Sequence, residues 1–244
     1  MSAHKERIDK LLVARGLFDS RAKAQAAIEA GLVRAGGKRV GKASEEIATD
    51  AAIEASPAHP YVSRGGVKLA AALDHFGFDP KGRICLDVGA STGGFTQVLL
   101  ERDAAKVYAV DVGSGQLHES LRAKPEVVSL EKTDIRTLSP AVLDPSPDFM
   151  VCDVSFISLK LVLPPALALA RKPAQLIALI KPQFEAGRAQ LKRGFVRDPA
   201  IHQAVCDEIA AFVTSLGWRV LETIPSPISG GDGNEEFLLG AVHD

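Results

Sequence analysis

The stretch Cys85-Leu-Asp-Val-Gly-Ala-Ser-Thr-Gly-Gly-Phe-Thr96 joins an apolar run of strand length to a segment with helical spacing. The apolar run covers residues 84–88 and is followed at once by a turn that contains three glycines. Glycines at a strand-to-helix turn let the backbone approach a ligand closely. The stretch therefore predicts a strand, a ligand-binding turn and a helix that begins at Gly94.

Outward from this turn, apolar runs of strand length alternate with helical segments. The expected strands are 107–111, 149–153, 176–181, 218–224 and 235–242, and the expected helices are 63–76 (capped by Ser63), 116–123, 157–171 and 198–217. This alternation predicts an α/β domain with a doubly wound, mostly parallel sheet. Residues 182–197 lack a regular period and are rich in basic residues, so we expect a mobile loop near the substrate there.

The spacing of the glycine turn distinguishes between two kinds of ligand. The dinucleotide fingerprint GxGxxG is absent, and Asp87 would repel a pyrophosphate, so a cationic ligand such as S-adenosylmethionine is favoured. Asp111 ends the next strand, where it can accept hydrogen bonds from the ribose diol of such a ligand. Asp134 follows the third strand and is expected near the edge of the ligand's adenine. The expected cofactor-binding residues are Asp87, Gly89, Ser91, Gly93, Gly94, Phe95, Asp111 and Asp134.

Positive charge is concentrated near the start of the chain. Residues 5–42 hold ten basic and four acidic residues, a net charge of +6, although the whole chain carries −1. Two short helices are expected, one around Leu11 that stops at Gly16 and one over residues 21–30. Gly36-Gly37 predicts a hairpin turn between residues 32–35 and 38–40. A basic surface on a small domain indicates a nucleic-acid contact or a solvated face.

This basic segment resembles the S4-like RNA-binding domain over roughly residues 5–55. The resemblance is carried by its RxDKLL opening, the second helix SRAKAQAAIEAGLV and the hairpin VRAGGKRV. It implies salt-sensitive contact with the shape and phosphates of structured RNA. The implied RNA-binding residues are Arg7, Arg21, Lys23, Arg34 and Lys38.

Four ionisable residues are expected to meet at one edge of the sheet, where strands and helices end: Lys68, Asp153, Lys181 and Glu236. Each has an ordinary alternative, as a surface lysine, a helix cap, a strand-end charge or a solvated edge. Their order resembles the catalytic tetrad of the FtsJ/RrmJ-like ribose 2'-O-methyltransferases. With the motifs DVGASTGGFT, CDVSFIS and LIKPQFEAG, the whole chain resembles the TlyA, or hemolysin A, family of ribosomal RNA methyltransferases.

The resemblance implies an S4-like domain at residues 1–60, a linker at about 56–62 and a Rossmann-like methyltransferase domain at 61–244. It implies methyl transfer from S-adenosylmethionine to a ribose 2'-hydroxyl, in known members that of a cytidine, with ribosomal RNA or ribosomal subunits as partners. Lys181 is the expected base, because a hydroxyl proton must leave during attack. Lys68 and Asp153 would orient Lys181 and the hydroxyl, and Glu236 would hold Lys68 or the ribose in place. A non-catalytic RNA-binding or ribosome-assembly factor is the alternative.

The sequence lacks the residues that other kinds of methyl transfer require. Exocyclic amine methylation usually requires a proline-rich motif after the fourth strand, and Asp153-Val-Ser-Phe156 has no proline. Cytosine C5 methylation requires a nucleophilic thiol, and Cys152 should point away from the side that Asp153 faces. No apolar run reaches the roughly 18 residues of a membrane helix, and the cysteines lack a CxxC metal spacing. We expect a cytoplasmic protein without membrane or metal.

Overall fold

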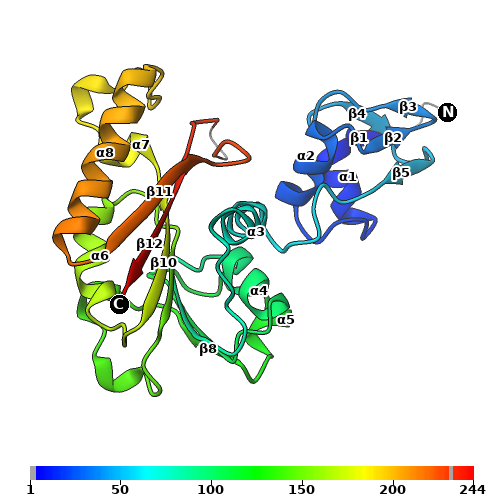
Figure 1. Ribbon diagram of the computed structural model, residues 1–244. Coiled ribbons are helices and arrows are strands. Elements are labelled where there is room, and N and C mark those ends of the chain that lie inside the picture. The colour runs from blue at the N-terminus through cyan, green and yellow to red at the C-terminus, as the bar shows by residue number, and fades with distance from the viewer. Residues whose placement is uncertain (1–3, 231–232) are drawn as a thin grey trace. The chain divides into compact units, whose positions relative to one another are not determined.

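The computed structural model describes residues 4–230 and 233–244. The chain divides into two compact units, Met1–Pro60 and Tyr61–Asp244, called here the head and the body. Figure 1 shows the elements of each unit. Within the described part of the chain, no helix is long and apolar enough to cross a membrane.

The head packs two helices against short strands. Helix α1 (Ile8–Ala14) and helix α2 (Arg21–Glu29) bury Ile8, Leu12 and Ile28 in a small core. Strands β1 (Lys5–Arg7) and β4 (Glu46–Ala48) pair antiparallel, while β2 (Val33–Ala35) pairs with β3 (Lys38–Arg39) and β5 (Ile53–Ala55). The two helices and the hairpin are as predicted, and β1, β4 and β5 were not foreseen.

The hairpin turn requires its two glycines. Gly36 and Gly37 have φ values of +56° and +77°, in the left-handed region that both central residues of such a two-residue turn occupy. The turn places Arg34 opposite Arg39 on neighbouring strands. The basic residues of this hairpin therefore share one short ribbon.

The body is built on a seven-stranded sheet in the order β11-β12-β10-β9-β6-β7-β8. Its strands are β6 (Ile84–Val88), β7 (Lys106–Val110), β8 (Val127–Leu130), β9 (Phe149–Cys152), β10 (Ala174–Ile180), β11 (Arg219–Pro225) and β12 (Phe237–His243). Strands β6 to β10 run parallel, and β12 runs antiparallel to both β10 and β11. The predicted doubly wound, mostly parallel sheet is confirmed.

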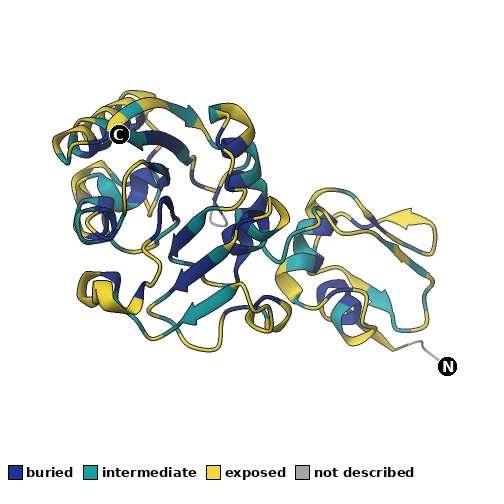
Figure 2. Ribbon diagram, turned by 60° about the horizontal axis from the view of Figure 1, so that its bottom comes forward, coloured by how far each residue is buried: buried dark blue, intermediate teal, exposed yellow. Residues whose placement is uncertain are grey.

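Helices cover both faces of this sheet (Figure 1). They are α3 (Gly65–Phe76), α4 (Gly94–Glu101), α5 (Glu119–Arg122), α6 (Leu159–Leu167), α7 (Pro182–Glu185) and α8 (Pro199–Ser215), with 3₁₀ turns η1 (Ile135–Thr137), η2 (Pro140–Val142) and η3 (Arg188–Gln190). Alternate residues of β6 serve the two faces: Cys85 packs with α3 and α4, and Leu86 packs with α6 and α8. The central strands β6 and β9 are almost entirely buried, as Figure 2 shows.

Three sequence predictions about the helices need correction. Ser63 does not cap a helix, because α3 begins at Gly65 after Arg64 and has no side-chain cap. Helix α6 is shorter than residues 157–171, since Ser158 caps it and it ends at Leu167. Residues 182–197, expected to be an irregular loop, contain regular structure: α7, η3 and a bridge between Lys192 and Phe195.

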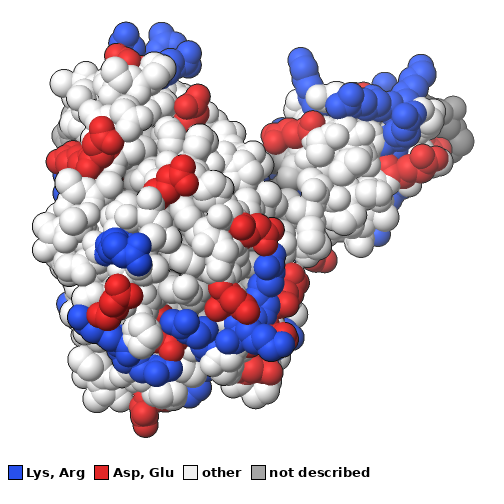
Figure 3. All heavy atoms as spheres, viewed as in Figure 1, with Lys and Arg blue, Asp and Glu red and all other residues white. Residues whose placement is uncertain are grey.

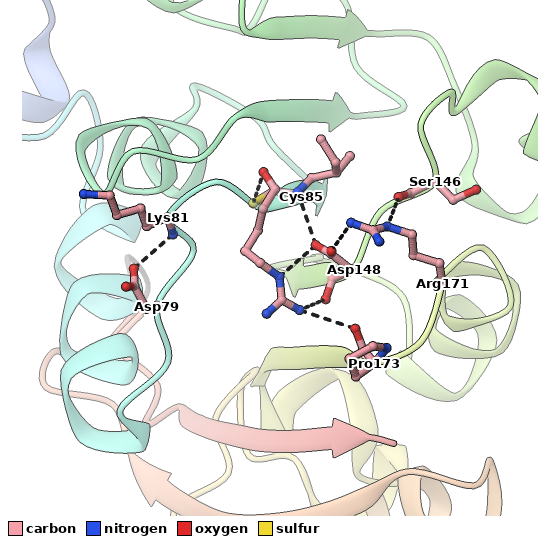
Figure 4. A network of polar contacts seen from close by, with 9 residues as sticks. Asp79, Lys81, Cys85, Ser146, Asp148, Arg171 and Pro173 are labelled. Carbon is pink, nitrogen blue, oxygen red and sulfur yellow. Dashed lines mark hydrogen bonds and ion pairs between the residues drawn. The ribbon is translucent and has the colours of Figure 1, made fainter.

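An ion cluster around the buried Asp148 carboxylate lies at the opposite end of the sheet from the glycine turn. The Asp148 carboxylate accepts a hydrogen bond from Arg83 Nε at 2.9 Å. It also binds Arg171, as Figure 4 shows. Asp148 precedes β9, Arg83 precedes β6 and Arg171 precedes β10. The cluster therefore joins the beginnings of three neighbouring strands and leaves their carboxyl ends for the site.

Candidate active site

Three cavities adjoin one another at the carboxyl ends of the parallel strands. The turn cavity, of about 520 Å³, is lined by the loops after β6, β7, β8 and β9. The lysine cavity, of about 450 Å³, is lined by Lys68, Ser155, Phe156, Lys181, Gln183, Phe184, Leu191, Gly194 and Glu236. A smaller cavity of about 160 Å³ shares Ser91 and Asp153 with the turn cavity and Lys181 with the lysine cavity. Ser155 lines all three.

The glycine turn after β6 is shaped by close backbone contacts. Gly89 has φ +84°, and a Cβ there would lie 2.4 Å from the backbone oxygen of Asp153. Gly93 has φ +97°, and a Cβ there would lie 2.5 Å from the side chain of Leu121. Both residues must therefore be glycine for the turn to pack as it does.

The predicted cofactor residues separate into groups. Gly89, Ser91, Asp111 and Asp134 line the turn cavity, and Gly94 and Phe95 line the smaller cavity. Gly93 lines none of the three, and its position allows α5 to pack against the turn.

Two of the three carboxylates that line the turn cavity, Asp111 and Asp134, are held by neighbouring donors. Asp111 accepts hydrogen bonds from the backbone N–H groups of Ser91 (2.8 Å) and Gly113 (2.7 Å), so it ties the glycine turn to the end of β7. Asp134 caps η1 and binds the Arg136 guanidinium, whose hydrogen bonds lower the pKa of this carboxyl. Both carboxylates therefore face the cavity in fixed orientations.

Asp87 lies beneath the turn and not in it. Its side chain is fully buried, accepts a hydrogen bond from Thr96 Oγ1 at 2.6 Å, and lines none of the three cavities. Burial raises the pKa of Asp87 to about 7, and the Thr96 hydrogen bond opposes that rise. Strand alternation explains the position, because Asp87 follows Cys85 on the face that packs against α4.

The four predicted catalytic residues form two ion pairs. Lys181 Nζ lies 2.6 Å from Asp153 Oδ1 and donates a hydrogen bond to Ser155 Oγ at 2.8 Å. Lys68, on α3, binds the Glu236 carboxylate just before β12, and both side chains are buried. Lys68, Lys181 and Glu236 line the lysine cavity, and Asp153 lines the two cavities beside it. Residues separated by up to 168 positions are thus brought together.

Several side chains of the site were not predicted. Ser155 holds Lys181, and its signal was its place two residues after Asp153. Gln183 is buried in the wall of the lysine cavity, two residues after Lys181. Phe156 is 90% exposed with φ +65°, and its ring centroid lies 5.1 Å from that of Phe184.

Cys152 is buried and packs with the α6 and α8 face of the sheet. Burial raises the pKa of its thiol above the ordinary range. Its side chain lines none of the three cavities. The structure thus gives this thiol a position in the core.

The predicted RNA-binding residues of the head have different partners. Arg7 and Arg21 both bind Asp9, Lys23 pairs with Asp19 at 2.8 Å, and Arg34 donates to the Gly37 carbonyl at 3.2 Å. Lys38 is exposed at the end of the hairpin. Lys and Arg side chains gather along one edge of the head in Figure 3.

A sheet with this strand order, whose carboxyl ends carry a glycine turn and two lysine–carboxylate pairs, defines a methyltransferase of the FtsJ-like class. The FtsJ-like methyltransferase family model matches residues 61–242. The chain belongs to this family, and an S4 domain model matches residues 6–53 of the head.

Individual relatives agree with the family. The chain is 43% identical over 240 residues to the 16S/23S rRNA (cytidine-2'-O)-methyltransferase TlyA of Mycobacterium tuberculosis, covering 97% of this chain and 90% of that protein. It is 38% identical to Hemolysin A of Brachyspira hyodysenteriae, covering 95% of this chain and 98% of that protein. A solved structure of a Streptococcus thermophilus protein, provisionally assigned as a hemolysin, matches with TM-score 0.79 and 42% identity, covering 99% of this chain and 90% of that one.

Proposed function

We propose that this protein transfers a methyl group from S-adenosylmethionine to the 2'-hydroxyl of a cytidine ribose in ribosomal RNA. The observation that carries the proposal is Lys181, 2.6 Å from Asp153, on the wall between the cavity beside the glycine turn and the lysine cavity. Methyl transfer to a hydroxyl needs a proton acceptor beside the methyl donor. The name of the M. tuberculosis relative supports ribose as the acceptor and ribosomal RNA as the substrate.

The residues of the turn cavity fit S-adenosylmethionine. Asp111 and Asp134 offer carboxylate oxygens to the hydroxyl and amino groups of an adenosine, and the glycine turn lets the backbone approach it. S-adenosylmethionine supplies a methyl group that is already activated by a positively charged sulfur. We propose that Asp87 acts indirectly, by fixing Thr96 and with it the start of α4, and does not contact the cofactor.

Lys181 has the surroundings of a base that must hold a proton after accepting it. In its neutral form, its amine takes the proton of the 2'-hydroxyl as the oxygen attacks the methyl group. The resulting ammonium is held by the Asp153 carboxylate and the Ser155 hydroxyl. Lys68, neutralised by Glu236, lies on the wall of the same cavity and would orient the ribose.

The head supplies RNA affinity. Its basic side chains would follow the phosphates of structured RNA, and such contacts position a substrate without reading its bases. Ribosomal RNA or a ribosomal subunit is therefore the proposed partner. The cytoplasm, predicted from the sequence, is where such a substrate would be met.

The test is methyl transfer from radiolabelled S-adenosylmethionine to purified 16S rRNA, 23S rRNA and each ribosomal subunit, followed by nucleoside analysis. We expect label in 2'-O-methylcytidine. Label in a base-methylated nucleoside would overturn the proposed acceptor. Tight binding of RNA without any label on all four substrates would instead support the RNA-binding or assembly-factor alternative.

A further inference from the structure

Asp9 is the most completely enclosed charge of the head. It follows β1 on the first turn of α1, and its side chain is 0% exposed although its ordinary state is an anion. Its carboxylate accepts hydrogen bonds from Arg7, Arg21 and Gln25. These hydrogen bonds, that of Arg7 first, hold the pKa of Asp9 below its usual range. Asp9 is therefore a buried, ionised carboxylate.

The two arginines bind this carboxylate through the same edge of their guanidinium groups. Arg7 uses Nε on Oδ1 (3.1 Å) and Nη2 on Oδ2 (3.0 Å). Arg21 uses Nε (3.2 Å) and Nη2 (2.6 Å), both on Oδ2. In each arginine the Nη1 group takes no part in the contact with Asp9 and keeps its N–H donors for another acceptor. The side chains of Arg7 and Arg21 are 42% and 49% exposed, so neither arginine is enclosed as Asp9 is.

The shared oxygen brings the two cations close together. Because both Nη2 atoms contact Oδ2, at 3.0 and 2.6 Å, they lie at most about 5.6 Å apart. Without an anion between them, two guanidinium groups would repel each other and move as separate flexible side chains. With Asp9 the three side chains form a fixed group of net charge +1.

We propose that Asp9 is a positioning residue that holds Arg7 and Arg21 side by side as a preformed site for an RNA phosphate. This inference rests on the proposed RNA-binding function of the head and adds the device that orders it. A preformed site does not have to immobilise two long side chains at the moment of binding. A phosphate oxygen accepts guanidinium N–H groups readily, and the two Nη1 groups are the donors that remain for it.

The substitution Asp9→Asn separates position from charge, because the two effects have opposite signs. Loss of one negative charge should by itself strengthen binding to RNA. Loss of the carboxylate that aligns the arginines should weaken it. We expect the full-length Asp9→Asn variant to bind purified 16S and 23S rRNA about fivefold more weakly than the unaltered protein at fixed salt. Glu29→Gln removes the same charge from the exposed end of α2 and should not weaken binding.

A double-substitution cycle tests whether Asp9 acts through the arginines. In a chain that already carries Arg7→Ala and Arg21→Ala, adding Asp9→Asn should change rRNA affinity less than twofold. An equal loss in both backgrounds, or unchanged or tighter binding by Asp9→Asn alone, would overturn the inference. If the arginine pair itself can be removed without loss of rRNA affinity, the proposed phosphate site is overturned as well, whereas the role of the whole head is tested by removing residues 1–60.

A second variant keeps the test decisive if Asp9→Asn unfolds the head. Arg7→Lys with Arg21→Lys retains both positive charges and leaves Asp9 paired, but lysine cannot make the two-atom contact that orients guanidinium. We expect this variant to remain folded and to bind rRNA about fivefold more weakly. Affinity equal to that of the unaltered chain would mean that charge alone is used and would contradict the positioning role.

Discussion

Lys181 and Lys68 have the same kind of partner but different surroundings. Lys181 contacts both a carboxylate and a hydroxyl and borders the cavity that adjoins the glycine turn, whereas Lys68 binds Glu236 and borders the lysine cavity alone. A proton acceptor must lie where hydroxyl and methyl donor meet. This difference in position assigns proton transfer to Lys181 in the proposed reaction.

Substitutions at Lys181 distinguish a base from a fixed charge. Lys181→Ala should lower the single-turnover rate of methyl transfer about 100-fold while binding changes only a few fold, the usual scale for a lost general base. Lys181→Arg should be equally slow, since arginine keeps the charge but does not release its proton near neutral pH. Lys160→Arg, on α6 with Glu208 of α8 as partner, is the matched control and should remain active, because Lys160 lines none of the three cavities. Substantial activity of Lys181→Arg would assign this residue to charge stabilisation.

Asp87 gives the body a stability that depends on pH. Its pKa is about 7 in the folded chain and about 4 in an unfolded one. The folded state therefore keeps the proton over this interval while the unfolded state has lost it. The contribution of Asp87 is full below about pH 4 and is lost as the pH rises toward 7, by at most about 1.4 kcal/mol per pH unit.

The variant Asp87→Asn should remove this dependence. Urea unfolding of both chains at pH 5 and pH 8, followed by the fluorescence of Trp218, reports the body because this is the one tryptophan of the sequence. Between these pH values the unaltered chain should lose more stability than the variant. Parallel stability changes in the two chains would show that Asp87 is ionised throughout.

At the scale of elements, the glycine turn acts through backbone contact. Gly89→Ala should lower the affinity for S-adenosylmethionine more than tenfold, because its Cβ would meet the Asp153 backbone. Gly82→Ala is the matched control: its φ is +69°, yet nothing lies within 4 Å of a Cβ there. It should cost about 1 kcal/mol of stability and leave affinity unchanged. Calorimetric titration compares them, and an equal loss of affinity in both would implicate strain alone.

The elements that could be predicted are those with a local cause. The glycine turn, the Ser20 cap of α2 and the Asp198 cap of α8 follow from residues a few positions apart. The strands β1, β4 and β5 hold three residues each, too few for a hydrophobic period, and pair across long sequence distances.

In the candidate site, too, the features with a local cause could be predicted and the contacts between distant residues could not. Lys68 and Glu236 could be placed at element ends, but only tertiary structure pairs residues 168 positions apart. The buried position of Asp87 could have been predicted from strand alternation. Asp87 lies two residues after Cys85, so both side chains are on the same face of the sheet. Ser155 offered no pattern beyond its neighbour Asp153, because a single serine in a loop has many ordinary roles.

At the scale of the whole molecule, we expect the head to bind RNA and the body to bind S-adenosylmethionine. The head has its own core around Ile8 and Leu12, and the body contains the three cavities. Removal of residues 1–60 should therefore weaken binding to rRNA more than tenfold and reduce its salt dependence, while affinity for S-adenosylmethionine stays within a few fold. Filter binding over a salt series and calorimetry measure the two quantities. Unchanged rRNA affinity would remove the head from the substrate path.

The position of β12 has a consequence for synthesis on the ribosome. Strand β12 is made after every other described strand, yet it lies between β10 and β11. Neither of these two strands therefore has its final neighbour until residues 237–243 have left the exit tunnel. A nascent chain that pauses after Pro225 would present the apolar edge of β10, Ala174-Gln-Leu-Ile-Ala-Leu-Ile180, to any strand nearby. Glu236 would also be absent, leaving Lys68 without its carboxylate partner. Completion of the sheet and completion of the lysine cavity are thus one late event, and prematurely terminated chains should aggregate instead of accumulating as partly active enzyme.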